Sequence, residues 1–263
     1  MMNKHDVTIV FCTCDAYADL WENFFILLEK YWPECSAEII LNTETKSFQY
    51  KHFRISEPLN CAKNISWSDR LSISLKRVKT PYVLMMLDDF YLKAPVDHGR
   101  FLETLEYMKS NPGVASITYL KEPGIRKSRL DLPGFNDRSQ FSLYKMTAHI
   151  TLYRKDYLQS ILKKDETAWE FEVNGTIRSW FRKGSFLCPP NNMRAVFPYD
   201  YGSLCVRGRY YGPVKRYFEE WENFSFDTCR ETIESLPQHN GASTVKKINY
   251  LLKGLLSLFK ENI

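Results

Sequence analysis

No stretch of the 263-residue sequence reaches the about 18 consecutive apolar residues that a membrane-spanning helix requires. The N-terminal segment, MMNKHDVTIVFCTC, contains an apolar run only as long as a strand, so we expect no signal peptide there. Internal repeats and low-complexity linkers are also absent. These absences favour one globular domain in the cytoplasm, with peripheral attachment to the inner face of a membrane as an open alternative.

Two glycine-rich nucleotide-binding motifs are missing. The sequence contains neither the G-x-x-x-x-G-K-[ST] phosphate loop nor G-x-G-x-x-G after the first predicted strand, which disfavours P-loop and dinucleotide-binding proteins. The seven cysteines are odd in number and follow no framework pattern, which favours free thiols in a reducing compartment.

A strong excess of one charge is lacking as well. The net charge of +5 arises from 36 basic and 31 acidic residues that are spread along the chain. This balance suits a protein that meets an anionic ligand, such as a nucleotide diphosphate, or an acidic membrane surface. No basic cluster predicts binding to nucleic acid.

Strand-like and helical patterns alternate along the first half of the chain. Val7 to Cys14 is apolar and β-branched, which predicts a buried strand, and Ala37 to Leu41 predicts another. The residues between them have a helical period, with an inward stripe of Leu20, Phe24, Leu27 and Leu28. Alternation of this kind predicts an α/β fold with a mainly parallel sheet and a ligand beyond the carboxyl ends of its strands.

The segment WSDRLSISLKRVKTPYVLMMLDDFYL is the most informative one. It predicts a helix that Ser68 caps and that Thr80-Pro81 ends, with Leu71, Leu75 and Val78 on its inner face. Six apolar residues, Tyr82 to Leu87, then predict a strand that is covered on both faces. Asp88 and Asp89 follow that strand directly.

The second half of the chain has weaker patterns. We predict a helix over Val96 to Ser110, a strand over Val114 to Leu120 and a helix over Lys155 to Lys163. The polar, glycine- and proline-containing residues 121–140 predict a mobile loop that could cover a site, and residues 141–153 predict a strand.

Two adjacent carboxylates behind a buried strand are costly unless a cation compensates their charges. Mg²⁺ or Mn²⁺, bound through one or two carboxylates and the oxygens of a diphosphate, would compensate them. A strand-end turn with solvated aspartates is the alternative. The position of Asp88 and Asp89 after VLMML and before Phe90-Tyr91 favours the cation site.

YVLMMLDDFYL and the helix before it resemble the D-x-D region of GT-A glycosyltransferases, especially bacterial family-2-like enzymes that build surface polysaccharides, and VTIVFCTCD resembles their first strand. The resemblance implies a Rossmann-like mainly parallel sheet flanked by helices, with a nucleotide-binding half (1–120), an acceptor-side half (121–240) and a C-terminal amphipathic helix (241–263). It also implies metal-dependent, inverting transfer of a sugar from a nucleotide-diphosphate sugar, such as a UDP-sugar, to a glycan or polyprenyl-linked acceptor.

The same resemblance suggests roles for individual residues. Asp15 would contact the base or ribose, Asp88 the ribose and diphosphate, and Asp89 the metal. The aspartates of this chain are adjacent, whereas the family motif commonly reads D-x-D, so the choice of metal ligand stays open between them. Asp69 and Arg70 would border the nucleotide, with a solvated helix start as the equal alternative.

The acceptor side is predicted at KKDETAWEFEVNGT, which resembles the acceptor motif of GT-A enzymes. One acidic residue there would deprotonate the acceptor hydroxyl. In an extended segment Glu170 and Glu172 share one face, and Glu172 is preferred because a turn at Asn174-Gly175 would leave it at the edge of a cleft. Solvated glutamates on a surface strand are the alternative. We interpret His149 as a hydrogen-bonded core residue.

Two basic segments complete the sequence. Arg207 and Arg209, near Gly202 and Gly208, could close over phosphate, although a basic surface loop is favoured. Residues 243–261 predict an amphipathic helix that starts at Ser243 or Thr244. A membrane interface and packing on protein are equally open for its apolar stripe, which consists of Ile248, Leu251, Leu252, Leu255, Leu258 and Phe259.

Two other functions compete with glycosyl transfer. A nucleotidyl- or phosphotransferase would also need paired carboxylates and a metal. A membrane-associated protein that binds sugar nucleotides without turning them over would keep the same fold.

Overall fold

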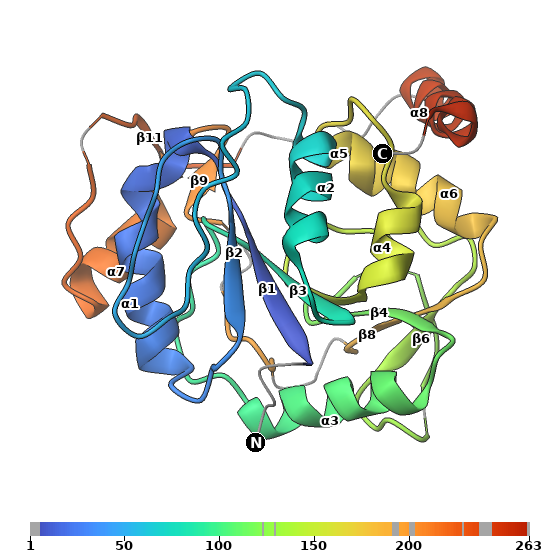
Figure 1. Ribbon diagram of the computed structural model, residues 1–263, viewed down its shortest axis with the longest axis horizontal. Helices are drawn as coiled ribbons and strands as arrows, with labels where there is room; N and C mark the ends of the chain where they lie inside the picture. The colour runs from blue at the N-terminus through green and yellow to red at the C-terminus, as the bar shows by residue number, and fades with distance from the viewer. Residues whose placement is uncertain are drawn as a thin grey trace.

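The computed structural model describes residues 6–122, 124–128, 130–190, 195–199, 203–227, 229–236 and 244–261. An eight-stranded sheet in the order β2-β1-β3-β7-β4-β8-β6-β5 crosses its centre (Figure 1). All of its strands except β7 and β6 run in one direction. The strands are β1 (Val7–Cys12), β2 (Glu38–Asn42), β3 (Tyr82–Leu87), β4 (Val114–Thr118), β5 (Ile125–Ser128), β6 (Asn136–Arg138), β7 (Thr151–Arg154) and β8 (Ser185–Cys188).

Helices and a second, smaller sheet surround this centre. The smaller sheet has the order β11-β10-β9, with β9 at Cys205–Val206, β10 at Arg209–Tyr211 and β11 at Thr232–Ile233. The helical segments are the 3-10 helix η1 (Asp15–Leu20), α1 (Trp21–Tyr31), α2 (Trp67–Arg77), α3 (His98–Ser110), α4 (Lys155–Ile161), α5 (Ala168–Glu170), the π-helical turn η2 (Phe171–Gly175), α6 (Thr176–Trp180), α7 (Gly212–Trp221), α8 (Thr244–Leu256) and the 3-10 turn η3 (Ser257–Phe259). None of the described helices is long and apolar enough to cross a membrane.

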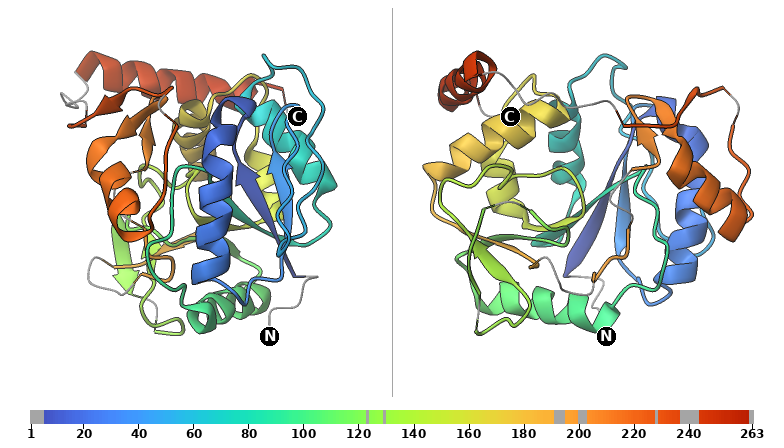
Figure 2. Two further views of the ribbon diagram at one scale, coloured as in Figure 1. Left: turned by 90° about the vertical axis from the view of Figure 1, so that its left-hand side faces the viewer. Right: turned by 180° about the vertical axis from the view of Figure 1, so that it is seen from behind.

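The sheet separates two apolar layers. On one face, Phe11 and its neighbours in β1 pack with α1, α3 and α7; on the other, Val10 packs with Leu71 of α2 and Leu158 of α4. Figures 1 and 2 show α1 and α2 on opposite sides of β1 and β3. The predicted α/β class, with a mainly parallel sheet flanked by helices and a C-terminal helix, is confirmed.

Most of the strongly patterned elements lie where the sequence predicts them. Strand β3 covers the six predicted residues, and the inward stripe of α1 is buried. The predicted cap of α2 is wrong by two residues. Ser66 accepts a hydrogen bond from the Asp69 N–H at 3.1 Å, while Ser68 lies inside the helix and is buried. Ser68 instead pairs with the backbone of Glu166, since its hydroxyl accepts from that N–H at 3.0 Å.

Two predictions for the second half are wrong. Residues 121–140 contain strands β5 and β6, and β6 continues the central sheet by pairing with β8. The strand predicted over residues 141–153 is limited to Thr151 onward, because residues 141–150 form turns. The strands β5 and β6 at the edge of the sheet have the polar composition of a loop. The turns of residues 141–150 contain apolar residues, as a strand would.

Helix α8 and the turn η3 leave part of the predicted apolar stripe exposed. Leu251, Leu252 and Phe259 are exposed and Leu255 and Leu258 are half-buried, while Gly254 and Ser257 face the domain. Gly254 sits so close to Ile177 of α6 that a Cβ atom at this position would overlap the Ile177 side chain. The side chain of Ile248 and the proposed cap Ser243 lie outside the described residues.

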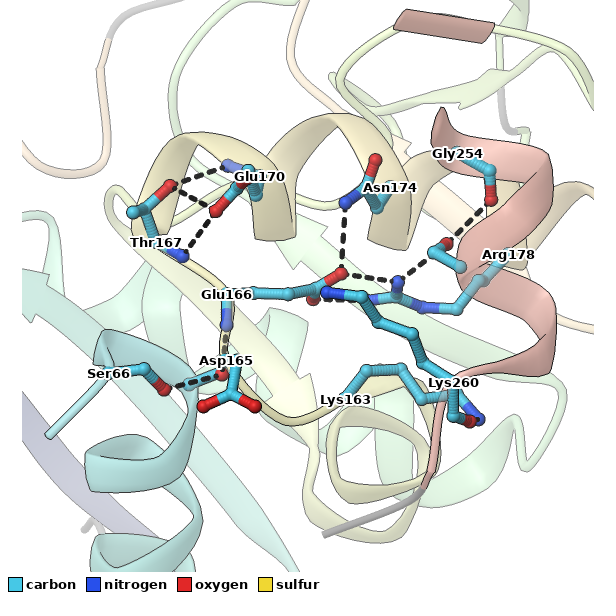
Figure 3. A network of polar contacts seen from close by, with 12 residues as sticks. Ser66, Lys163, Asp165, Glu166, Thr167, Glu170, Asn174, Arg178, Gly254 and Lys260 are labelled. Carbon is cyan, nitrogen blue, oxygen red and sulfur yellow. Dashed lines mark hydrogen bonds and ion pairs between the residues drawn. The ribbon is translucent and has the colours of Figure 1, made fainter. Parts of the chain in front are cut away.

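A buried ion pair joins the segment before α5 to α6 and η3 (Figure 3). The Glu166 carboxylate accepts two hydrogen bonds from Arg178, at 2.7 and 2.6 Å, and one from Asn174 at 3.0 Å. Arg178 also donates to the Ser257 hydroxyl at 2.9 Å. Glu166 and Arg178 are 0% and 3% exposed, so each charge depends on the other for compensation.

We expect Arg178→Met to lower the free energy of unfolding by about 3–5 kcal/mol, because it leaves the Glu166 carboxylate buried without a partner. Urea denaturation followed by circular dichroism measures this loss. The double variant Glu166→Leu/Arg178→Met should recover a large part of it, since it removes both charges. A loss below about 1 kcal/mol in the single variant would show that the pair contributes little.

Candidate active site

The candidate site lies where three parallel strands end side by side. Strands β2, β1 and β3 are neighbours, and polar residues follow each of them at the same edge of the sheet. Thr13 follows β1, Thr43 and Glu44 follow β2, and Asp88 and Asp89 follow β3. These side chains therefore lie together beyond the carboxyl ends of the strands, which is where the sequence predicts the ligand site.

Asp88 and Asp89 lie beneath neighbouring segments. Asp88 is 6% exposed and accepts a hydrogen bond from the Thr13 hydroxyl, which in turn accepts one from the Trp21 indole N–H at 2.7 Å. Burial and the charge of Asp89 raise the pKa of Asp88 well above its ordinary value. Burial also raises the pKa of Asp89 to about 7, although hydrogen bonding by Ser203 opposes the rise. Both carboxylates therefore lack full compensation of their charge.

The carboxylate pair fits a divalent cation that is bound together with a diphosphate. Within the described part of the chain, neither aspartate forms a salt bridge with lysine or arginine. The described residues also contain no cluster of three or more side chains that could hold a metal unaided. The protein thus offers Asp88 and Asp89, and the other ligand positions would fall to phosphate oxygens and water, as is usual for Mg²⁺.

Asp15 serves the local structure. Its carboxylate accepts hydrogen bonds from the Thr43 hydroxyl at 2.7 Å and from the N–H groups of Thr45 and Lys46 at 3.0 and 2.9 Å. These hydrogen bonds lower the pKa of Asp15 despite opposition from burial. Asp15 therefore holds the segment after β2 against the end of β1, and its oxygens are engaged within the protein.

Arg70 and Asp69 also have partners within the protein. Arg70 is 8% exposed and forms an ion pair with Glu44, whose second oxygen accepts from the Asp15 N–H at 2.7 Å. Arg70 is therefore not the solvated residue of the alternative prediction. Asp69 accepts hydrogen bonds from the Ser66 hydroxyl and from the Asp165 N–H, the latter at 3.1 Å. It ties the start of α2 to the segment before α5.

The segment that leads into β9 of the smaller sheet contacts the Asp pair through its backbone. The Asp89 carbonyl accepts a hydrogen bond from the Leu204 N–H at 2.7 Å, next to β9. Arg207 and Gly208 have positive φ angles of 53° and 79° and form the turn between β9 and β10, while Gly202 lies outside the described residues. Arg207 thus lies in a tight turn, whereas Arg209 lies in strand β10, so the predicted flexible loop is a hairpin here.

Arg230 fixes the turn between β9 and β10 against η1, and the sequence does not predict this role. Its guanidinium donates to both oxygens of Asp19, at 2.6 and 2.7 Å, and lies 4.4 Å from the centre of the Tyr17 ring. It also donates to the Gly208 carbonyl at 3.1 Å. More than 200 residues separate Arg230 from its partner in the chain, so no local pattern could reveal the contact.

A cleft of about 460 Å³ opens between this anchor and the end of β1. Its walls carry both charges, with Lys46 and Arg230 as the cations. The cleft is lined by Asp15, Ala16, Asp19, Lys46, Gly208, Asp227, Cys229, Arg230 and Glu231. The acidic side chains outnumber these two cations, and Arg230 already pairs with Asp19, so the cleft by itself has no excess of positive charge.

Glu170 and Glu172 lie on helical turns, so the predicted extended segment is wrong. Thr167 caps this helical segment, and the Glu170 carboxylate accepts from the Thr167 N–H at 3.0 Å, which completes a capping box. Asn174 and Gly175 are helical as well. The pattern T-A-W-E matches the capping signature [S/T]-x-x-E and could have shown the helix start.

Glu172 points toward the segment before β7. Its carboxylate accepts from the Ala148 N–H at 2.8 Å and from the Thr147 hydroxyl at 3.2 Å. Burial raises the pKa of Glu172, while the Ala148 hydrogen bond and His149 lower it. A buried carboxylate with a raised pKa is a stronger base than a solvated one.

His149 and its partner Glu122 link Glu172 to Asp88 and Asp89. The His149 Nε2 atom lies 2.8 Å from a Glu122 oxygen, and the His149 ring centre lies 6.4 Å from that of Phe90, the residue after Asp89. The sequence predicts a hydrogen-bonded core position for His149. The residue has Glu122 as its partner but is half-buried. Its neighbourhood connects the acidic residue on η2 with the end of β3.

No family model and no curated protein matches this sequence. Solved structures do match, among them S. aureus TarS 1-349 at 12% identity and a TM-score of 0.49, over 74% of this chain and 59% of that chain. A Pyrobaculum calidifontis mannosyltransferase in complex with GDP-Man and Mn²⁺ matches at 10% identity and a TM-score of 0.48, over 70% and 55%. Glucosyl-3-phosphoglycerate synthase from Mycobacterium tuberculosis, in complex with Mn²⁺ and uridine-diphosphate-glucose, matches at 10% identity and a TM-score of 0.44, over 68% and 66%.

The names of two of these proteins are those of sugar-transferring enzymes, a mannosyltransferase and a glucosyl-3-phosphoglycerate synthase. The chain spans less than two thirds of the TarS structures. Since each of these TM-scores is below 0.5, no ligand or residue role is transferred from the matched proteins to this chain.

Proposed function

We propose that this chain is a glycosyltransferase that moves a sugar from a nucleotide-diphosphate sugar to a glycan or lipid-linked acceptor. The observation that carries the proposal is the pair of the buried Asp88 and the half-buried Asp89, which has no lysine or arginine partner among the described residues, at the edge where β2, β1 and β3 end. A diphosphate bound with a divalent cation would supply the missing positive charge there. Lys46, in the cleft beside the end of β1, is the cation proposed to meet the anionic nucleotide.

Asp89 and Asp88 are the residues that would hold Mn²⁺ or Mg²⁺. Such an ion, when bound, neutralises the charge that develops on a leaving diphosphate. Because Asp15, Asp69 and Arg70 are engaged within the protein, their proposed part is to fix the ends of β1 and α2 around the donor rather than to bind it directly.

Glu172 is the proposed base. It is buried, it lies beside His149, and His149 contacts the residue that follows Asp89. In an inverting transfer, Glu172 would take the proton of the acceptor hydroxyl as this oxygen attacks the sugar from the side opposite the diphosphate. Glu170 is the weaker candidate, because its carboxylate completes the capping box.

The biological setting is part of the proposal. All seven cysteines are free, which suits a reducing, cytoplasmic location. Synthesis of a bacterial surface polysaccharide is the proposed role. A nucleotidyl- or phosphotransferase would use the same carboxylate pair, but the fold around Glu172 gives that alternative no separate support.

A panel of UDP-, GDP- and dTDP-sugars tests the proposal. We expect at least one donor to bind by calorimetry in Mn²⁺ and to be hydrolysed slowly or transferred, and EDTA should abolish both effects. Binding without any turnover would favour the non-catalytic alternative. Failure of every donor to bind, with and without Mn²⁺, would refute the proposed function.

A further inference from the structure

Helix α8 and the turn η3 contact the domain through the small residues Gly254 and Ser257, with Leu255 and Leu258 half-buried beside them, and the other large apolar side chains are exposed. Gly254 meets Ile177, and the Ser257 hydroxyl accepts from Arg178 at 2.9 Å (Figure 3). The exposed fractions of the large apolar side chains are 52% for Tyr250, 42% for Leu251, 51% for Leu252, 68% for Leu256 and 86% for Phe259. A helix that only packed on its own domain would turn these side chains inward.

The geometry of the helix explains this exposure. At about 100° per residue, Leu252 and Leu256 lie about 160° around the axis from Gly254, on the far side from the domain. Figure 2 shows α8 lying along the outside of the molecule. The Lys260 carbonyl, just beyond η3, accepts a hydrogen bond from the Lys163 ammonium group, so both the middle and the end of this segment are fixed. The apolar side is therefore held outward by a rigid attachment.

Basic side chains accompany this surface. Lys253 of α8 and Lys260, just beyond η3, are exposed, and the sequence of α8, TVKKINYLLKGLL, contains no aspartate or glutamate. The nearby acidic side chains have partners, since Glu261 pairs with Lys164 at 2.8 Å and Glu170 completes its capping box. Trp169, adjacent to Glu170, is 69% exposed, and tryptophan favours the interface between lipid and water.

We propose that α8 docks this protein onto a lipid surface that contains anionic headgroups. The exposed leucines and Phe259 would enter the apolar boundary, and the lysines would meet the headgroups. A second copy of the chain fits less well, because a symmetric contact would bring the same lysines together. The proposal is independent of the proposed chemistry, since it uses none of the residues around Asp88.

Co-sedimentation of the full chain with vesicles tests the docking. We expect strong binding to vesicles of phosphatidylcholine and phosphatidylglycerol in a 7:3 ratio and weak binding to phosphatidylcholine alone. Leu252→Ser/Leu256→Ser should lower the partition coefficient by about tenfold or more, since two apolar contacts are lost. Lys253→Glu should weaken binding to the anionic vesicles alone, by about fivefold or more.

Controls separate docking from folding. Both leucines of the test variant are exposed, so its thermal melt should match that of the wild type. Leu130→Ser/Leu236→Ser changes two leucines that are also exposed but lie outside α8, and it should bind vesicles like the wild type. Equal binding of the wild type to both kinds of vesicle, or no binding to either, would overturn the proposal. A dimer that Leu252→Ser/Leu256→Ser dissociates would assign the surface to a second copy instead.

Discussion

Replacing Asp89 with asparagine is expected to lower kcat/KM by about 1,000-fold or more, because a metal held at a leaving diphosphate supplies several kcal/mol of transition-state stabilisation. Asparagine keeps the shape of the side chain but removes a charged ligand. Calorimetry should show that Mn²⁺ no longer strengthens donor binding. Steady-state kinetics with the best donor of the panel measures the loss of turnover.

The folded state gives this prediction an internal check. Asp89 is a half-buried acid whose pKa is raised to about 7, so ionised Asp89 opposes folding when no cation is bound. The Asp89→Asn variant should therefore melt at the same temperature as the metal-free wild type, or higher. Asp156→Asn is a matched control, because Asp156 is exposed at the start of α4, which follows β7 at the end of the sheet opposite to the Asp pair. Unchanged Mn²⁺-dependent donor affinity in Asp89→Asn would remove Asp89 from the metal site.

Glu172→Gln is expected to lower kcat by about 100- to 10,000-fold while donor binding stays intact, because a positioned base contributes rate enhancement of this size. Glutamine can still accept the hydrogen bond from the Ala148 N–H, so the local structure should persist. In the wild type, kcat should fall as the pH drops through the pKa of Glu172, since the base must be ionised. Burial raises that pKa, so the fall should occur above pH 4.5.

Glu170→Gln is the control for this measurement. Glutamine also completes a capping box, so stability should change by less than about 1 kcal/mol and turnover by less than about fivefold. The comparison of the two variants decides between the candidate bases. A loss of turnover in Glu170→Gln with full activity in Glu172→Gln would reverse the proposed assignment.

The sequence predicts the first half of the fold because each pattern there is local. Buried strands such as Tyr82–Leu87 are continuous apolar runs, and the helices around them are amphipathic, so length and period identify both. The Asp88-Asp89 pair could be found for the same reason. Its position follows from the strand before it and from the rule that ligands gather at the carboxyl ends of parallel strands.

The sequence does not predict how the distant parts of the site meet. Arg230 reaches Asp19 across most of the chain, and Glu122 meets His149 through the order of strands in the sheet. Asp15 and Arg70 have the protein partners Thr43 and Glu44, which only the three-dimensional arrangement brings close. A charged residue beside a site is not distinguishable in sequence from one that binds the ligand.

The π-helical turn η2 connects two parts of the molecule that were considered separately. It carries Glu172, and it packs directly against α8. If α8 rests on a membrane, the proposed base stands at a fixed height above the lipid. An acceptor carried on a lipid would then be selected by the distance between its reactive hydroxyl and its anchor. Acceptors whose chains are too short or too long would not bring that hydroxyl to Glu172.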